Sequence, residues 1–265
     1  MEYVRPKALG EALDALAAFD DPTPLAGGTD LMVEVNLSHR RPDVVVSLRA
    51  LDELRRWDDT WIGAGVTFAR LEGADDPALA QLARTVGSPQ IRAAATLGGN
   101  LGTASPAGDS LPFLAAADAH VVLQSTAGER RLRWDEFFVG PKQTVRRPDE
   151  LIVGVELPSR PERQAFAKVG VRQAMVISVV SCCVLRDPSG VTRVALGSVG
   201  PTVLRATGAE EVASQAVRLT DTDLEEFQRR VSAEVRPITD HRSTAEYRRH
   251  AAGVVARRAL ERCLR

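Results

Sequence analysis

The chain has 265 residues, of which 44% are hydrophobic and 26% are charged, the proportions of a globular protein with a substantial core. Its 34 basic and 35 acidic residues give a formal net charge of −1, which does not favour a nucleic-acid partner. No apolar run is long enough for a membrane helix. The N-terminus lacks the apolar region of a secretory signal, and the three cysteines have no metal-site spacing. We therefore expect a cytoplasmic protein with no membrane span and no metal site.

Helical and extended patterns alternate along the first 160 residues. Apolar spacing predicts a helix over 10–19, and PLAGGTDLMVEVN predicts a short strand, a glycine turn and a helix. The β-branched run 42–48 predicts a buried strand. Further predicted elements are a strand, turn and Thr67-capped helix over 61–71, a helix over 77–86, and strands over 120–125, 128–134 and 151–157.

The composition changes at 157–164, where prolines and arginines are typical of an interdomain linker. Three strands are predicted beyond it, over 164–171, 175–185 and 191–200, followed by helices over 220–234 and 243–265. We expect a capping box between Ser243 and Glu246 at the start of the last helix.

Several side chains in this second part have simple structural interpretations. The adjacent Cys182 and Cys183 point to opposite faces of a predicted strand, and we interpret both as small buried hydrophobic residues. The arginines of the last helix are expected to form a solvated face; they are Arg248, Arg249, Arg257 and Arg258.

Two glycine clusters are the candidate binding elements: AGGTD (26–30) and TLGGN (96–100). Glycines lack a Cβ, so their backbone N–H groups can converge on an anion, and a helix that starts after the first cluster would favour a phosphate there. The alternative is that Gly27 and Gly28 form only a strand-to-helix turn. Neither cluster matches the dinucleotide or phosphate-loop fingerprint.

The second cluster continues into Thr103, Ser105 and Asp109, in a segment otherwise made of small and apolar residues. Hydroxyl groups can donate to phosphate or carbonyl oxygens, and a carboxylate can accept from sugar hydroxyls. This pattern is compatible either with a backbone cradle for a phosphorylated, polyhydroxylated ligand or with a structural loop.

These motifs carry a family resemblance. AGGTD, SPQIRAAATLGGNLGTASPAGDS, DELIVGVELP and AFAKVGVRQAMVISVVS together resemble the FAD-binding medium subunit of the molybdenum hydroxylases, the family that includes carbon monoxide dehydrogenase and xanthine dehydrogenase. The resemblance covers essentially the whole chain.

The resemblance implies an α+β fold. Residues 1–160 would form a vanillyl-alcohol-oxidase-type (PCMH-type) FAD-binding domain with subdomains over about 1–55 and 56–160. Residues 161–265 would form a C-terminal domain like that of the carbon monoxide dehydrogenase flavoprotein, a three-stranded antiparallel sheet with helices.

The resemblance also implies a set of FAD contacts. The backbone at Ala26, Gly27, Gly28 and Thr29 would hold the pyrophosphate, with Asp30 at a position where serine is common. Further contacts would come from Thr96, Gly99, Asn100 and Thr103, and Asp109 would bind hydroxyls of the sugar or ribityl chain. Ile152 would pack on the flavin ring and Lys168 would approach the ring system, the alternative for Lys168 being a solvated strand lysine. No catalytic acid, base or nucleophile is implied.

The implied function is electron transfer through FAD. Electrons would arrive from an iron–sulfur small subunit, after hydroxylation of a substrate at a molybdopterin-binding large subunit, and leave to NAD, a quinone or oxygen. The implied assembly is a dimer of heterotrimers, with the molybdenum and iron–sulfur centres on the partner subunits. Two alternatives are a self-contained flavin-dependent reductase or oxidase, similar to the enolpyruvoyl-sugar reductases, and a binding protein that has lost FAD.

Overall fold

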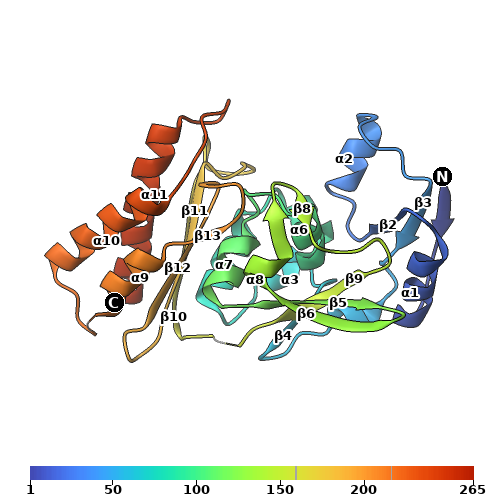
Figure 1. The fold of residues 1–265 in the computed structure, drawn as a ribbon, viewed down its shortest axis with the longest axis horizontal. Coiled ribbons are helices and arrows are strands. Elements are labelled where there is room, and N and C mark those ends of the chain that lie inside the picture. The colour runs from blue at the N-terminus through green and yellow to red at the C-terminus, as the bar shows by residue number, and fades with distance from the viewer. Residues whose placement is uncertain (159, 216) are drawn as a thin grey trace. The chain divides into compact units, whose positions relative to one another are not determined.

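The structure is a computed structural model that describes residues 1–158, 160–215 and 217–265 (Figure 1). Its residues fall into two compact units. Unit 1 comprises Met1–Arg70, Pro89–Ala104 and Ala119–Pro158, and unit 2 comprises Leu71–Ser88, Ser105–Asp118 and Ser159–Arg265. The described helices include none that is long and apolar enough to cross a membrane.

Unit 1 begins with a small parallel sheet. Its strands lie in the order β1 (Glu2–Val4), β3 (Val44–Ser47) and β2 (Pro22–Leu25). Helix α1 (Leu9–Ala18) connects β1 to β2. The central strand β3 is buried along its whole length, as its β-branched sequence predicts. The glycine turn follows β2 and leads into α2 (Leu31–Asn36).

A second sheet of unit 1 is antiparallel. Its order is β4 (Trp61–Gly63), β9 (Leu151–Glu156), β5 (His120–Ser125) and β6 (Gly128–Arg133), and a hairpin is formed by β7 (Phe138–Gly140) and β8 (Gln143–Thr144). The remaining helical elements around it are η1 (Asp52–Arg55), α3 (Phe68–Leu71, whose last residue belongs to unit 2), α5 (Pro89–Ala94), α6 (Leu97–Thr103) and α8 (Trp134–Phe137). The predicted Thr67 cap is present, because Thr67 Oγ1 accepts from Arg70 N at 3.3 Å.

One hydrophobic core joins the two sheets of unit 1. Its buried side chains come from α1, β3, the η1 region, β5 and β9, and include Leu13, Leu16, Val46, Val122 and Val153. The apolar side of α1 therefore packs against both sheets of unit 1.

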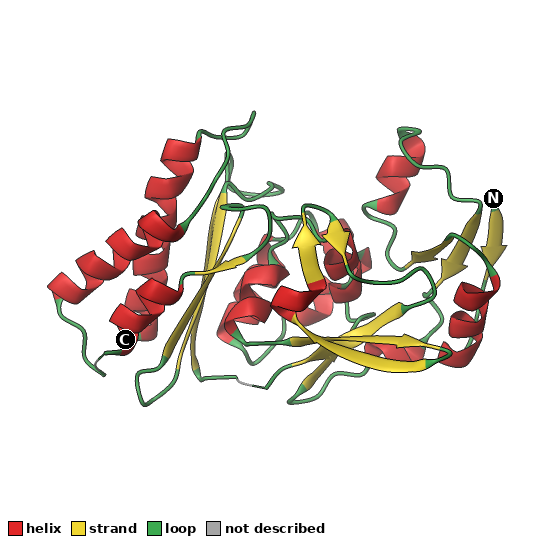
Figure 2. Ribbon diagram, viewed as in Figure 1, coloured by secondary structure: helices red, strands yellow, loops and turns green. Residues whose placement is uncertain are grey.

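Unit 2 is built on an antiparallel sheet with the order β10 (Arg163–Val169), β11 (Val180–Arg186), β12 (Thr192–Gly197) and β13 (Leu204–Arg205). Helices α9 (Thr207–Ser214), α10 (Asp221–Glu234) and α11 (Ala245–Cys263) lie on one face of the sheet, and α7 (Ser110–Ala116) lies on the other (Figure 2). Helix α4 (Pro77–Thr85) packs against β10. The sheet has four strands where three were expected, because the short β13 pairs with β12.

The predicted strand over 175–185 begins only at Val180. Two local features keep the preceding residues out of the sheet. Met175 has φ 49°, in the left-handed region, and the Ser178 hydroxyl donates to Asp109 Oδ1 at 2.5 Å.

The cysteines of β11 are buried hydrophobic residues, as predicted. Cys182 and Cys183 are fully buried, and Cys182 belongs to the core shared with the helices. Burial raises the pKa of both thiols above their usual value, and raises the pKa of Cys263 to about 12. None of the three is therefore a reactive thiolate at neutral pH.

Two predictions for the last helix are wrong. The N-cap is Thr244 rather than Ser243, and Thr244 Oγ1 accepts from Tyr247 N at 3.1 Å. Arg248 is not on a solvated face, because only 3% of it is exposed. Its guanidinium donates to Val179 O, Ser198 O and Asp240 Oδ1 at 2.8, 3.0 and 2.7 Å. A buried arginine that satisfies carbonyls from a neighbouring strand and loop leaves no signal in helical periodicity.

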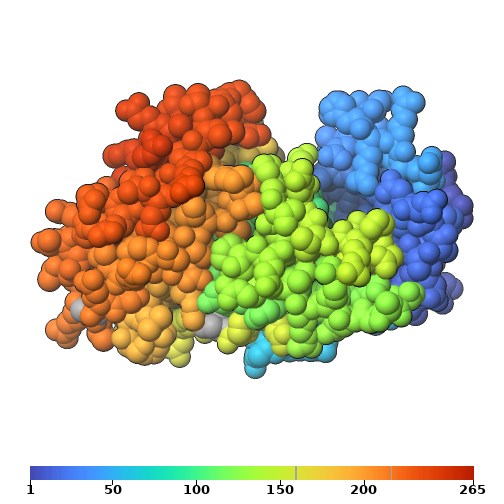
Figure 3. Space-filling view, viewed as in Figure 1, coloured from blue at the N-terminus to red at the C-terminus, as the bar shows by residue number. Residues whose placement is uncertain are grey.

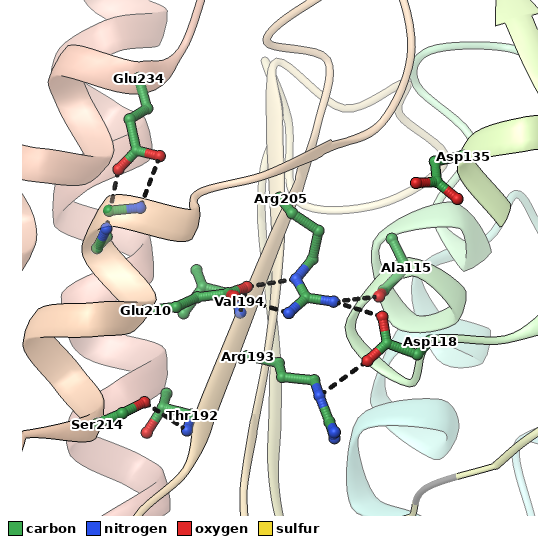
Figure 4. Close-up of polar contacts among 12 residues, drawn as sticks. Ala115, Asp118, Asp135, Thr192, Arg193, Val194, Arg205, Glu210, Ser214 and Glu234 are labelled. Carbon is green, nitrogen blue, oxygen red and sulfur yellow. Dashed lines mark hydrogen bonds and ion pairs between the residues drawn. The ribbon is translucent and has the colours of Figure 1, made fainter. Parts of the chain in front are cut away.

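A second arginine, the half-buried Arg205, joins three elements of unit 2 (Figure 4). The Arg205 guanidinium binds both carboxylate oxygens of Glu210 and donates to Ala115 O and Asp118 Oδ1 at 3.0 and 2.8 Å. Ala115 lies in the last turn of α7 and Glu210 lies in α9, so this side chain connects the two faces of the sheet. Arg193 also pairs with Asp118, at 3.0 Å.

Candidate functional site

The structure distributes the predicted site residues over both units. Unit 1 holds Ala26, Gly27, Gly28, Thr29 and Asp30 on the β2–α2 turn, Thr96, Gly99, Asn100 and Thr103 at α6, and Ile152 on β9. Unit 2 holds Asp109 immediately before α7 and Lys168 on β10.

The first glycine motif is a tight turn that only glycine can form. A Cβ on Gly27 would overlap the carbonyl oxygen of Ala94, at the end of α5. Gly28 has φ 72°, in the left-handed region that favours glycine. The turn therefore packs backbone to backbone against the segment that leads into the second glycine motif.

The second glycine motif forms the first turn of helix α6. Thr96 is its N-cap, and Thr96 Oγ1 accepts from Gly99 N at 3.0 Å. Gly98 faces inward, where a Cβ would overlap Ala64, and Gly98 N donates to Ala64 O at 2.8 Å. The helix ends at Ala104, whose φ of 47° is left-handed. The segment for which a backbone cradle or a structural loop was expected thus begins as a short helix that packs against Ala64, directly after β4.

Two glycines lie on the exposed side of α6, and for neither would a Cβ meet the backbone of another element. A Cβ on Gly99 would have only Thr96 Oγ1 nearby, at 3.2 Å, and a Cβ on Gly102 only Ile152 Cδ1, at 3.7 Å. They are three residues apart and so share one side of the helix. Glycine costs a helix about 1 kcal/mol relative to alanine. Glycines at exposed helix positions lower stability, but without a Cβ they allow another molecule to approach the helix backbone closely.

This glycine face brings together residues that were predicted separately. Ile152, the predicted flavin-packing residue, is 6% exposed on β9, and its Cδ1 lies beside Gly102. Gly102 was not among the predicted contacts, because a glycine in a glycine-rich segment gives no sign of which side of a helix it occupies.

A hydrogen bond links the two glycine motifs directly. Thr103 Oγ1, in the last turn of α6, donates to Asp30 Oδ2 at 2.7 Å, across 73 residues of sequence. Asp30 is the last residue of the first motif, so the predicted pair of distant clusters is one local structure in unit 1.

The predicted residues of unit 2 form a buried ion pair. Lys168 Nζ lies 2.5 Å from Asp109 Oδ2 and 3.2 Å from Thr85 O, and its side chain is 7% exposed. The alternative of a solvated strand lysine is therefore wrong. Burial raises the pKa of the Asp109 carboxyl, while the Lys168 ammonium and the Ser178 hydroxyl act in the opposite direction. Ser178 was missed, since a serine 69 residues from Asp109 carries no pairing signal.

Comparison with known proteins identifies the family to which the chain belongs. Residues 1–160 match the family model described as the FAD binding domain in molybdopterin dehydrogenase, and residues 165–263 match the CO dehydrogenase flavoprotein C-terminal domain. The chain belongs to the family of FAD-binding subunits of the molybdenum hydroxylases. Members of this family are oxidoreductases, and FAD is their cofactor.

The relatives include subunits of several dehydrogenases. The nicotinate dehydrogenase FAD-subunit of Eubacterium barkeri is 37% identical over 232 residues, covering 80% of this chain and 78% of the relative. A putative xanthine dehydrogenase FAD-binding subunit of Escherichia coli is 30% identical, covering 97% of this chain and 94% of the relative.

Solved structures agree with this assignment. Carbon monoxide dehydrogenase from Hydrogenophaga pseudoflava superposes with a TM-score of 0.91 at 29% identity, covering 99% of this chain and 96% of that one. Reconstituted CO dehydrogenase from Oligotropha carboxidovorans gives a TM-score of 0.92 at 28% identity, covering 100% and 97%. The expected FAD-binding fold with a C-terminal antiparallel sheet is confirmed.

The residues of unit 1 fit FAD. The exposed glycine side of α6 offers space that a Cβ would take up, and the Gly27–Gly28 turn offers exposed backbone. Ile152 lies beside Gly102, largely buried under that side of the helix. Within the described residues, no group of three or more His, Cys, Asp or Glu side chains is arranged to hold a metal ion.

Proposed function

We propose that this chain is the electron-transfer subunit of a molybdenum-containing hydroxylase complex. Its FAD would take electrons from an iron–sulfur subunit and pass them to NAD, a quinone or oxygen. The substrate would be hydroxylated at a molybdopterin-binding large subunit, in a dimer of heterotrimers. The names of the relatives support this, because carbon monoxide dehydrogenase relatives are medium chains and others are FAD subunits of dehydrogenases.

The observation that carries the proposal is the exposed glycine side of α6 next to the Gly27–Gly28 turn. FAD, when bound, supplies reversible electron uptake and release. In this proposal the chain positions the cofactor. The backbone of Ala26, Gly27, Gly28 and Thr29 would bind the pyrophosphate, Thr96, Gly99, Asn100 and Thr103 would add contacts, and Ile152 would pack on the ring.

The roles of Asp109 and Lys168 toward FAD stay predictions. Their carboxylate and ammonium are bonded to one another in unit 2. Lys168 therefore carries a neutralising partner, and any effect of its positive charge on the flavin would be smaller than that of an unpaired lysine.

The test is the visible flavin spectrum of the purified chain, before and after incubation with FAD. A chain that stays colourless and binds no added FAD would contradict the proposal. The complex isolated from its natural host should contain molybdenum and iron as well. The isolated chain should show at most a slow diaphorase activity, whereas substrate turnover by the chain alone would favour the self-contained reductase or oxidase.

A further inference from the structure

Helix α2, which follows the first glycine motif, is not held in place by apolar packing. None of its six residues is buried. Met32, Val33 and Leu37 are 40%, 53% and 60% exposed. In the space-filling view, the segment that contains α2 protrudes from the neighbouring N-terminal part of unit 1 (Figure 3). Leu31 and Val35 are only half-buried, so polar contacts must help to set the position of the helix.

Two polar contacts fill this role, and both lead to the same end of α6. Asp30 and Glu34 are four residues apart and so lie on one side of α2. Asp30 Oδ2 accepts from Thr103 Oγ1 at 2.7 Å, and Glu34 Oε1 pairs with Lys142 Nζ at 3.2 Å. Lys142 N in turn donates to Ala104 O at 3.0 Å, so the β7–β8 hairpin turn is itself attached to the C-cap of α6.

The Asp30 side chain does not cap helix α2, although Asp30 is the N-cap residue. Such a side chain normally accepts from N–H groups of the first turn. In α2 these groups are satisfied by the backbone, since Met32 N donates to Gly28 O and Val33 N and Glu34 N donate to Asp30 O. The carboxylate makes no cap hydrogen bond and is directed at Thr103 instead.

We propose that the Asp30–Thr103 hydrogen bond, supported by the Glu34–Lys142 ion pair, is a strap that fixes the first glycine motif against α6. Asp30 is then a positioning residue rather than an FAD ligand. A carboxylate facing the pyrophosphate would repel it, whereas one that accepts from Thr103 holds the turn without a phosphate contact. This role rests on the proposed function, because the turn is positioned for FAD.

The first test is a double-mutant cycle on the full chain, with FAD affinity measured by quenching of flavin fluorescence. Asp30→Ala and Thr103→Val should each weaken FAD binding about fivefold to tenfold, the range of one ordinary hydrogen bond. The double variant should bind FAD no more weakly than the more affected of the two single variants, because Thr103 also contacts FAD in the proposed function and each single variant already breaks the same strap. Asp30→Asn and Thr103→Ser keep the acceptor and the donor, and both should bind FAD within about twofold of the wild type.

Losses that add in the double variant would overturn the strap, because they would show that the two side chains act on FAD independently. So would an Asp30→Asn variant as weak as Asp30→Ala, which would indicate a direct role of the charge.

The second test needs no FAD. In the FAD-free chain, amide hydrogens of residues 31–37 should exchange faster in Asp30→Ala and Thr103→Val than in the wild type, and at the wild-type rate in Asp14→Asn, whose side chain is exposed on α1. Equal rates in all variants, or amides already unprotected in the wild type, would overturn the strap. Failure of the wild type to bind FAD would refute the proposed function alone, since this measurement would still decide on the strap.

Discussion

At the scale of single residues, the glycines of α6 have different reasons to be glycine. Gly98 is required by the fold, because Ala64 occupies the place of its Cβ. Gly102 is not, since only Ile152 Cδ1 lies within 4 Å of that place. The same residue type in one short helix thus serves packing at one position and surface access at another.

Gly102→Ala should separate stability from binding. The FAD-free variant should be as stable as the wild type or more stable by up to about 1 kcal/mol, because alanine is the better helix former. FAD affinity should fall by at least tenfold, since a methyl group would occupy the exposed side of the helix. Denaturant unfolding of the FAD-free chain and FAD titration measure the two effects.

Gly98→Ala is the matched control in the same helix. It should destabilise the FAD-free chain through overlap with Ala64, by about 1 to 3 kcal/mol. If Gly102→Ala binds FAD as tightly as the wild type, the exposed side of α6 is not the cofactor surface.

Asp240 should contribute acid-sensitive stability. Partial burial alone would raise the pKa of its carboxyl, but hydrogen bonds from Arg242 N, the Arg248 guanidinium and Ser243 N outweigh this and lower the pKa to about 2. A folded-state pKa below that of the unfolded chain contributes stability that is present above about pH 4 and is lost as the pH falls toward 2.

Between pH 6 and pH 2.5, the wild type should therefore lose about 1 to 2 kcal/mol more unfolding free energy than Asp240→Asn. Urea unfolding at the two pH values measures the difference. Asp14→Asn is the control for removal of an exposed carboxylate, and equal losses in the wild type and Asp240→Asn would contradict the prediction.

At the scale of elements, long polar side chains add connections between helices and strands that the apolar core already packs together. Arg205 joins α7, α9 and β13, and Arg248 joins α11 to the start of β11. Neither role could be predicted from the sequence, because the partners are backbone carbonyls and carboxylates far away along the chain. The helices themselves could be predicted, since α1, α4 and α10 begin and end within two residues of their apolar and capping patterns.

Arg205→Met should destabilise the chain by about 2 to 4 kcal/mol, because Glu210 and Asp118 would keep their half-buried charges without this partner. Thermal or denaturant unfolding measures the loss. Arg193→Met is the comparison, and its loss should be smaller because the Arg193 side chain is more exposed, at 27% against 15% for Arg205. Equal stability of Arg205→Met and the wild type would show that the network in Figure 4 adds no stability.

At the scale of the whole molecule, the compact units do not follow the order of the chain. Residues 71–88 and 105–118 precede the proline-rich segment at 157–164 but belong to unit 2. There α4 packs on β10 and α7 on β11 and β12, with every residue of α7 buried. The C-terminal sheet thus covers two helices from the first 160 residues.

A fragment of residues 1–160 should consequently not fold to a stable monomer. Without residues beyond 160, the apolar sides of α4 and α7 would be exposed to water, which favours aggregation. Circular dichroism and size-exclusion chromatography of the fragment, beside the full chain, are the measurements. A monomeric fragment with a cooperative unfolding transition would contradict this expectation.

The sequence by itself determined the class of the protein through its resemblance to a known family, and it determined most of the helices and strands and the positions of the two glycine motifs. The helices and strands depend on local patterns: periodic apolar residues, caps and β-branched runs. Only the tertiary structure decided that the second motif is a helix with one packed and one exposed glycine side, that Thr103 bonds Asp30, and that Lys168 is paired with Asp109 and Ser178. These features join residues far apart in sequence, and such pairings depend on how the elements pack rather than on any local pattern.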